Sequence, residues 1–360
     1  MLRIDRGLRE ARSTFILLAL TMVALAACAQ VQEGAPKLGD PTDPRAQKTF
    51  AEALAWEKNG ANVFALDAYR KANKQDGGHC TACLSNAYFN ANRIGAYKDA
   101  EQIARQWLQI APAEERAPIH WALASALQNQ AFNAKKDKDK LFAESCEEFK
   151  AALQLKPDLA PVRYHLGISL AWLHRDEEAR AEFTAFLDQD HTSPDLRGRA
   201  DRFVRHVELA RAKMAPLFSV ATLDGQRISL GNLVGKVVLI DFWATWCESC
   251  VEALPHIQSI AKKFEGQPLV VLSVSVDKDE VKWKKFVEKN GMNWLQTRDT
   301  VDGRISRAFG VDEIPATFTI DADGVLEDQH VGDASIEPKL KKLVAQTAKP
   351  KPAATNGAAN

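Results

Sequence analysis

The sequence has few cysteines and no excess of charge of either sign. Its 360 residues include six cysteines, too few for a small scaffold held together by many disulfides. The 47 lysines and arginines balance the 47 acidic residues, so no net field attracts nucleic acid, and we expect no nucleic-acid partner. Apolar residues make up 46% of the chain, which suffices for two hydrophobic cores of ordinary size.

Residues 1–27 have the pattern of a signal peptide. Four arginines within residues 1–12 precede an uncharged, mostly apolar run over 13–27 that is too short to span a membrane comfortably. The run ends in Leu25-Ala26-Ala27-Cys28, which resembles a bacterial lipobox. That resemblance implies lipidation of Cys28 and anchoring to a membrane that faces the periplasm. Because Ala29 rather than aspartate follows, it implies the outer membrane. The alternative is a plain secretory signal with an incidental cysteine.

Two further segments are predicted to lack regular structure. Residues 28–45 are rich in proline, glycine and charge, which is typical of a flexible tether. Residues 349–360 form a short polar tail that we expect to be disordered. Between the tether and the tail lie two regions of different periodicity, 46–212 and 213–348.

A pattern of small and aromatic residues recurs through 46–212. Each copy has a small residue followed four and seven positions later by small or aromatic residues; the copies begin at Ala65, Ala100, Ser145 and Ala179. The starts lie about 35 residues apart, with one longer interval that contains a charged segment. The pattern resembles the tetratricopeptide repeat, which implies an all-α solenoid whose concave surface binds a partner protein or peptide. A helical spacer without a ligand is the alternative.

From residue 213 onward, short strands alternate with helices. The apolar run 237–243 suits a central strand buried on both faces, and a second such strand is predicted over 269–276. Amphipathic helices are predicted from the first strand to about residue 264 and over 279–290. A hairpin that begins at 317 and a last helix over 335–347 complete an α/β domain with helices on both faces of its sheet.

Cys247 and Cys250 directly follow the first buried strand, at the predicted start of a helix. Cysteines three residues apart at a helix start can reach one another for a disulfide. The free N–H groups and the helix dipole favour a thiolate at Cys247, which would attack, while Cys250 would resolve the mixed disulfide. An inert disulfide and half of a zinc site are the alternatives, although no second ligand pair with zinc spacing lies nearby.

The segment 242–247, with Gly235-Lys236 before it and Ile314-Pro315 after it, resembles the extracytoplasmic TlpA/ResA-like branch of thioredoxins. The resemblance implies a thioredoxin fold over 213–348 and a thiol–disulfide oxidoreductase without a cofactor or metal. It implies further that Pro315 is a cis-proline that leaves the backbone of Ile314 free to bind a substrate strand. In the same way, Trp246 would cover the dithiol and Gly332 would leave room for substrate.

Asp241 lies six residues before Cys247, where cytoplasmic thioredoxins keep a buried carboxylate. Burial disfavours the anion, so we expect a raised pKa at Asp241. The carboxylate could then accept the proton of Cys250 through a water molecule. The alternative is a core carboxylate without a part in catalysis.

The sequence also departs from the family pattern at three positions. Ser249 stands where relatives usually have proline, which should loosen the turn between the cysteines. Glu248 places a negative charge beside Cys247 and opposes thiolate formation. Many relatives carry a glutamate three residues after the second cysteine, but here Ala253 occupies that position and Glu252 precedes it.

A second cysteine pair, Cys80 and Cys83, lies at the expected start of a repeat helix. It forms either a local disulfide that staples the helix end or a second dithiol that exchanges electrons with Cys247. Cys146 falls within a repeat and is predicted to be a packed core thiol.

Together these observations predict an extracytoplasmic, lipid-anchored enzyme that reduces protein disulfides through Cys247 and Cys250. A reductase in an oxidising compartment must itself be reduced, which implies a membrane electron donor. The repeats would recruit partners. Two alternatives remain: a disulfide oxidase or isomerase, and a non-enzymatic repeat scaffold whose thioredoxin domain only binds.

Overall fold

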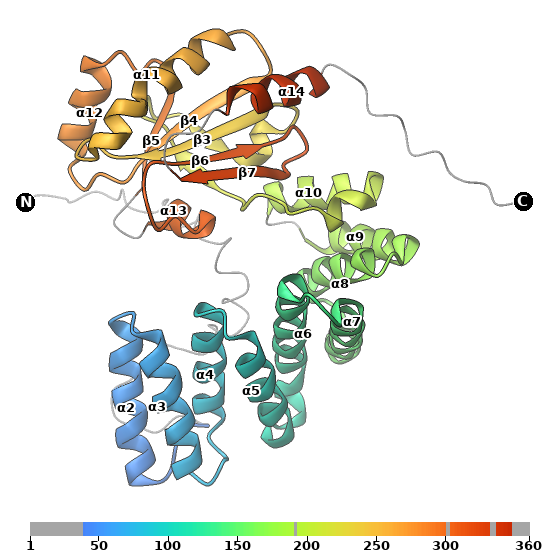
Figure 1. Ribbon diagram of the computed structural model, residues 1–360. Helices are drawn as coiled ribbons and strands as arrows, with labels where there is room; N and C mark the ends of the chain where they lie inside the picture. The colour runs from blue at the N-terminus through green and yellow to red at the C-terminus, as the bar shows by residue number, and fades with distance from the viewer. Residues whose placement is uncertain (1–38, 191–192, 300–302, 332–335, 348–360) are drawn as a thin grey trace, which may run out of the picture. The chain divides into compact units, whose positions relative to one another are not determined.

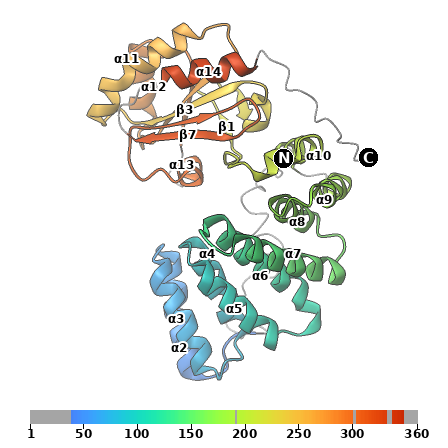
Figure 2. The same cartoon turned by 45° about the vertical axis from the view of Figure 1, so that its right-hand side comes forward.

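The computed structural model describes residues 39–190, 193–299, 303–331 and 336–347. The chain divides into two compact units after His174 (Figures 1 and 2). The boundary predicted between residues 212 and 213 therefore lies inside the second unit. Cys28 and Gly332 lie outside the described residues, as do the signal peptide, most of the tether and the tail.

The first unit is entirely helical in its described part. Each of its helices packs against the next one along the chain. In chain order, the α-helices and one short 3₁₀ helix are α2 (Pro44–Lys58), α3 (Asn62–Gln75), α4 (Thr81–Arg93), α5 (Tyr97–Ile110), η1 (Ala113–Glu115), α6 (Arg116–Asn133), α7 (Lys138–Leu155) and α8 (Ala160–Trp172). Local signals agree with these bounds: the Asp43 side chain accepts hydrogen bonds from the first backbone N–H groups of α2, and Pro44 occupies its first position.

The small residues of the repeat pattern lie where neighbouring helices touch. Ala65, Ala100 and Ser145 are fully buried, and so are the aromatic residues four positions after the first and third of them, Tyr69 and Phe149. Small side chains at these points let helix backbones approach closely, and the aromatic rings fill the space beside them. The predicted helical character of the region is confirmed, while its membership of the tetratricopeptide family stays a prediction.

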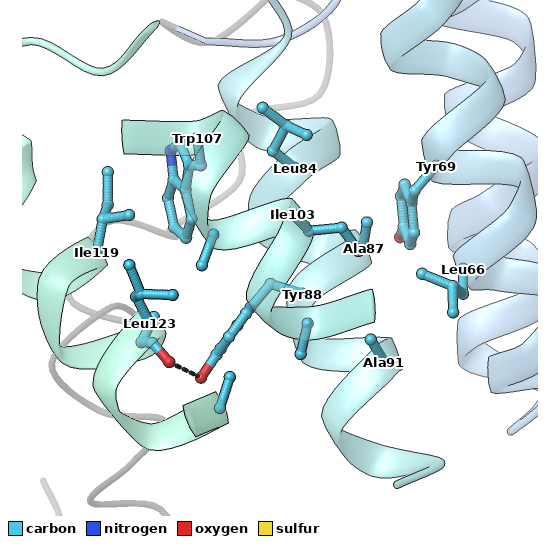
Figure 3. Close-up of a cluster of buried hydrophobic side chains, with 14 of the residues drawn as sticks. Leu66, Tyr69, Leu84, Ala87, Tyr88, Ala91, Ile103, Trp107, Ile119 and Leu123 are labelled. Carbon is cyan, nitrogen blue, oxygen red and sulfur yellow. Dashed lines mark hydrogen bonds between the residues drawn. The ribbon is translucent and has the colours of Figure 1, made fainter. Parts of the chain in front are cut away.

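The core of this unit is continuous from α2 to α6, and Figure 3 shows the part of it from α3 onward. Trp107, Ile119 and Leu123 are buried together with Tyr88, whose hydroxyl donates a 2.7 Å hydrogen bond to the backbone carbonyl of Ala122. Each fully buried large apolar side chain stabilises the fold by about 1.5–3 kcal/mol. The tyrosine is tolerated because its polar end is satisfied inside the core.

The second unit joins two helices, a five-stranded sheet and the helices that cover the sheet. Its elements in chain order are α9 (Asp176–Gln189), α10 (Pro194–Arg205), η2 (Val207–Arg211), β1 (Ser219–Ala221), β2 (Arg227–Ser229), η3 (Leu230–Leu233), β3 (Val237–Trp243), α11 (Glu248–Lys263), β4 (Leu269–Ser275), α12 (Glu280–Lys289), β5 (Leu295–Arg298), α13 (Arg304–Phe309), β6 (Ala316–Ile320), β7 (Leu326–Val331) and α14 (Glu337–Thr347). Helix α10 is bonded into this unit, since the buried Arg199 donates to the carbonyl of Ala215 and Ser229 donates to Asp195.

The large sheet has the strand order β5-β4-β3-β6-β7, with β3 parallel to β4 and antiparallel to β6. Every residue of β3 is buried, as its continuous apolar run predicts. Val238, Ile240 and Phe242 face one core, whereas Val237 and Leu239 face a second core formed with α11 and α14. This is the thioredoxin fold, and it confirms the predicted fold class. Strand β5 and helix α13 were not predicted.

We expect Tyr88→Phe to destabilise the first unit by about 1 kcal/mol, because it removes the buried hydrogen bond from the tyrosine hydroxyl to the carbonyl of Ala122. Urea unfolding followed by circular dichroism measures the change. Tyr97→Phe is the matched control, since Tyr97 is only half-buried and no hydrogen bond of its hydroxyl is present in the described part of the chain. Equal stability of Tyr88→Phe and the wild type would contradict the expectation.

Candidate active site

The two cysteines of the second unit lie at the junction between β3 and α11. Cys247 is the N-cap of α11, and its Sγ accepts a 3.2 Å hydrogen bond from the backbone N–H of Cys250. The two are joined as a disulfide, with their Cα atoms 5.2 Å apart. The sulfur of Cys247 thus lies at the positive end of the helix dipole, where a thiolate is favoured.

The surroundings of the dithiol are apolar and partly covered. Cys247 is 8% exposed and Cys250 is 5% exposed, in a cluster with Trp243 and Trp283. Trp246 directly precedes Cys247 in the sequence and is expected to cover the dithiol. The residue is 68% exposed.

The predicted proline lies against the dithiol. The Ile314–Pro315 peptide bond is cis, and the carbonyl oxygen of Ile314 lies 3.9 Å from the Sγ of Cys247. Strand β6 begins directly after this proline and pairs with β3, the strand that leads to the cysteines. Segments more than 60 residues apart in the sequence therefore meet at one sulfur, as the resemblance implied.

A carboxylate that sequence reasoning missed holds the loop before Cys247. Asp277, buried just after β4, accepts hydrogen bonds from the backbone N–H (2.9 Å) and the hydroxyl (2.7 Å) of Thr245. Ser275 also donates to Asp277. Parallel strands end at the same edge of a sheet, so a polar residue after β4 was the available signal.

Asp241 lies in the middle of β3 and is 6% exposed. The hydroxyl of Ser273 on β4 donates a 3.1 Å hydrogen bond to its Oδ2, and Trp294 Nε1 donates to that hydroxyl at 2.9 Å. Burial raises the pKa of Asp241 from its ordinary value of 3.8 to about 7, and the hydrogen bond from Ser273 opposes this only in part.

A cavity of about 20 Å³ separates Asp241 from Cys250. It lies between α11 and the sheet, and its lining consists of Asp241, Trp243, Cys250, Ala253, Leu254, His256, Ile257, Pro315, Thr317 and Ile336. This volume accommodates one water molecule. A proton can therefore pass between the Cys250 thiol and the Asp241 carboxyl group through a single bridging water.

The departures from the family pattern have visible consequences. The Oγ of Ser249 lies 3.5 Å from the Sγ of Cys247, where proline would offer no hydroxyl. Glu248 and Glu252 are exposed, whereas Ala253 lines the cavity with a methyl group. In this chain the position of the family's glutamate therefore supplies no charge to the site.

The second cysteine pair also forms a disulfide, at the N-terminus of α4. Cys80 and Cys83 are both fully buried, and the backbone N–H of Cys80 donates a 3.1 Å hydrogen bond to the side chain of Asn73. Cys146 is buried within α7. No protein thiol can reach the Cys80–Cys83 sulfurs without opening the helix packing, which favours the staple over a second redox centre.

Two negative findings apply to the described residues alone. None of the helices there is long and apolar enough to cross a membrane. Nor do three or more histidine, cysteine or acidic side chains gather in that part of the chain so as to hold a metal ion.

The fold and the site define a class: thioredoxin-fold proteins with a redox-active cysteine pair at the start of a helix. Residues 212–329 match the model of the AhpC/TSA family. The thiol-disulfide oxidoreductase ResA of Bacillus thuringiensis (strain Al Hakam) is 31% identical over 134 residues, 36% of this chain and 77% of the relative. ResA of Bacillus subtilis (strain 168) is 31% identical over 122 residues, 34% of this chain and 68% of the relative.

A solved structure of a putative thiol:disulfide interchange protein DsbE from Chlorobium tepidum is 27% identical, with a TM-score of 0.35, covering 38% of this chain and 97% of that one. The chain belongs, through its C-terminal domain, to the ResA family of thiol-disulfide oxidoreductases. The enzyme class predicted from the sequence is confirmed.

We expect the stability of the oxidised protein to fall as pH rises from about 4 to about 7. In that window folded Asp241 keeps a proton that the unfolded chain has lost, so the folded state binds more protons. The loss is at most on the order of 4 kcal/mol. Asp241→Asn should remove this dependence and be more stable than the wild type at pH 8.

Urea unfolding at several pH values measures this effect. Asp312→Asn, at an exposed position, serves as the control and should keep the wild-type pH profile. An Asp241→Asn profile parallel to that of the wild type would show that Asp241 has no raised pKa.

Proposed function

We propose that this protein reduces protein disulfides outside the cytoplasm through Cys247 and Cys250. One observation carries the proposal: the cysteine pair begins α11 beside a cis-proline, with a buried carboxyl group of raised pKa behind Cys250. An inert disulfide would need neither the carboxyl group nor the cavity that connects it to the second sulfur.

The proposed reaction has two exchanges. The Cys247 thiolate attacks one sulfur of the substrate disulfide, forming a mixed disulfide and releasing the other sulfur as a thiolate. Cys250 then loses its proton to Asp241 through a water and attacks the Sγ of Cys247. The second substrate sulfur leaves as a thiolate and is protonated. Two electrons pass to the substrate, and the Cys247–Cys250 disulfide forms.

The local charges favour the reducing direction. A strongly stabilised thiolate makes a dithiol oxidising, because it stabilises the reduced form. Glu248 sets a negative charge next to Cys247 and works against that stabilisation. The disulfide formed in each cycle needs two electrons from a donor, and we place that donor in the membrane.

The substrate surface would lie around Cys247. Trp246 would pack on the substrate chain, and the backbone of Ile314 beside Pro315 would hydrogen-bond it as an added strand. Gly332 belongs to this surface by its position in the family pattern alone.

The N-terminal pattern supports lipid anchoring through Cys28 at the outer membrane, facing the periplasm. The buried Cys80–Cys83 disulfide supports an oxidising compartment, where such staples persist. We assign the helical unit to the recruitment of a partner protein or peptide, because stacked helix pairs present extended surfaces.

Cys250→Ser should trap substrates. Without the resolving thiol the mixed disulfide at Cys247 accumulates, so non-reducing electrophoresis should show covalent adducts that disappear on reduction. Cys247→Ser is the control and should trap none. A Cys250→Ser protein without adducts in cells and without reaction with a model disulfide would support the scaffold alternative.

The reduction potential separates the reductase from an oxidase or isomerase. Equilibration with glutathione should give a potential closer to that of thioredoxin, about −270 mV, than to that of strong oxidants, about −120 mV. A value near the second figure would reverse the direction proposed.

The staple assignment of the second pair makes its own prediction. Replacing both Cys80 and Cys83 by alanine should lower the stability of the first unit by about 2 kcal/mol, the entropy of closing a loop this short. The rate of disulfide exchange at Cys247 should not change. A loss of exchange with unchanged stability would assign Cys80 and Cys83 to electron transfer instead.

A further inference from the structure

His256 lies two turns after the active-site cysteines in α11 and lines the same cavity as Asp241 and Cys250. The residue is partly exposed, but its Nε2 atom is buried and has no hydrogen-bond partner among the described residues. A buried polar atom without a partner costs about 1–3 kcal/mol, so it calls for an explanation.

A second orphaned atom belongs to the same lining. Trp243 Nε1 is buried and has no hydrogen-bond partner within the described residues. Together with the Asp241 carboxyl group, a donor and two acceptor-capable groups thus line a space the size of one water molecule. A bound water typically makes two to four hydrogen bonds, which matches this set.

We propose that His256 relays protons between this cavity and solvent, so that Asp241 becomes a carboxylate again in each catalytic cycle. The proposal rests on the proposed function and deepens it. Asp241 is too deeply buried to exchange its proton with solvent directly. An imidazole can accept a proton on one nitrogen and release another from the other nitrogen, and His256 both lines the cavity and is partly exposed as a residue.

The proton balance is complete. Cys250 gives its proton to the Asp241 carboxylate through the water as its thiolate attacks Cys247. Asp241 then returns that proton to the water, whose other proton passes to Nε2 of His256. A proton leaves His256 from Nδ1 to solvent, which leaves the ring as its Nε2–H tautomer. When the electron donor reduces the disulfide again, Nε2 gives its proton back through the water for the Cys250 thiol and Nδ1 takes up a proton from solvent, which restores the starting tautomer. His256 acts through Asp241, so it is a positioning and relay residue.

Other ionisable groups near the site do not compete for this role. Of the described cavity-lining residues, only Asp241, Cys250 and His256 ionise. Glu252, four residues before His256 on α11, is exposed. Several charged groups on adjoining elements are paired with one another: Glu337 of α14 with Lys263 and Lys341, and His330 of β7 with Asp328, which also pairs with Lys339. Glu248 and Lys262 of α11 and Lys342 of α14 are exposed and do not line the cavity.

The test follows closure of the Cys247–Cys250 disulfide when the reduced full-length protein is mixed with oxidised glutathione at low buffer concentration. His256→Ala should slow closure about tenfold at neutral pH, below the 10²–10⁴ typical of a direct acid or base. Added imidazole should restore the rate. Ser259→Ala, at an exposed position of the same helix, is the matched control and should behave as the wild type.

Two further variants separate a relay from a structural role. His256→Gln keeps a polar side chain that can hold the water but cannot relay, so it should be as slow as His256→Ala and should serve if the latter does not fold. In an Asp241→Asn background, loss of His256 should have no further effect.

Rapid closure in His256→Ala, or a slow rate that imidazole does not restore, would overturn the relay. A wild-type protein that does not react with oxidised glutathione at all would instead overturn the proposed function.

Discussion

The site depends on keeping one carboxyl group out of water behind a cysteine pair. Asp241 occupies the central strand of the sheet, where the surrounding apolar residues of β3 make its ionised form costly. Among the described residues, the hydroxyl of Ser273 alone donates directly to it, so the pKa stays raised, at about 7, and the group can both take up and release a proton near neutral pH. A more exposed or better paired aspartate at this place would have a lower pKa and would be a weaker base near neutral pH.

The rest of the domain fixes distances around that group. Cys247 caps the start of α11, and Cys250 lies in the first turn of the helix, where it lines the cavity. The two sulfurs are therefore about one helical turn apart along the chain and lie close enough to form a disulfide. The Thr245–Asp277 bonds hold the preceding loop to the end of β4. Helix α11 is a regular element and Asp277 directly follows strand β4, so both hold the sulfur atoms in a precise position.

The sequence predicts the parts of this arrangement that depend on local patterns. The apolar run of β3, the helix start at Cys247 and Pro315 all carry a signal in their immediate neighbours, and the fold class follows from them. Strand β5 could not be predicted because its buried Gln296 and Thr297 break the apolar pattern on which strand prediction relies. Asp277 and His256 were missed for another reason: their significance comes from groups that only folding brings near them.

The chain contains two Cys-x-x-C motifs of equal spacing, each beginning a helix, each with its first sulfur accepting the N–H of the second cysteine. Chemistry alone gives an incoming thiol no reason to prefer one over the other. Access does: Cys80 and Cys83 show no surface at all, whereas Cys247 retains a small window. One polypeptide can therefore hold a permanent cross-link and an exchangeable one in motifs of equal spacing, because burial alone shields the first from any thiol too large to enter the helix packing.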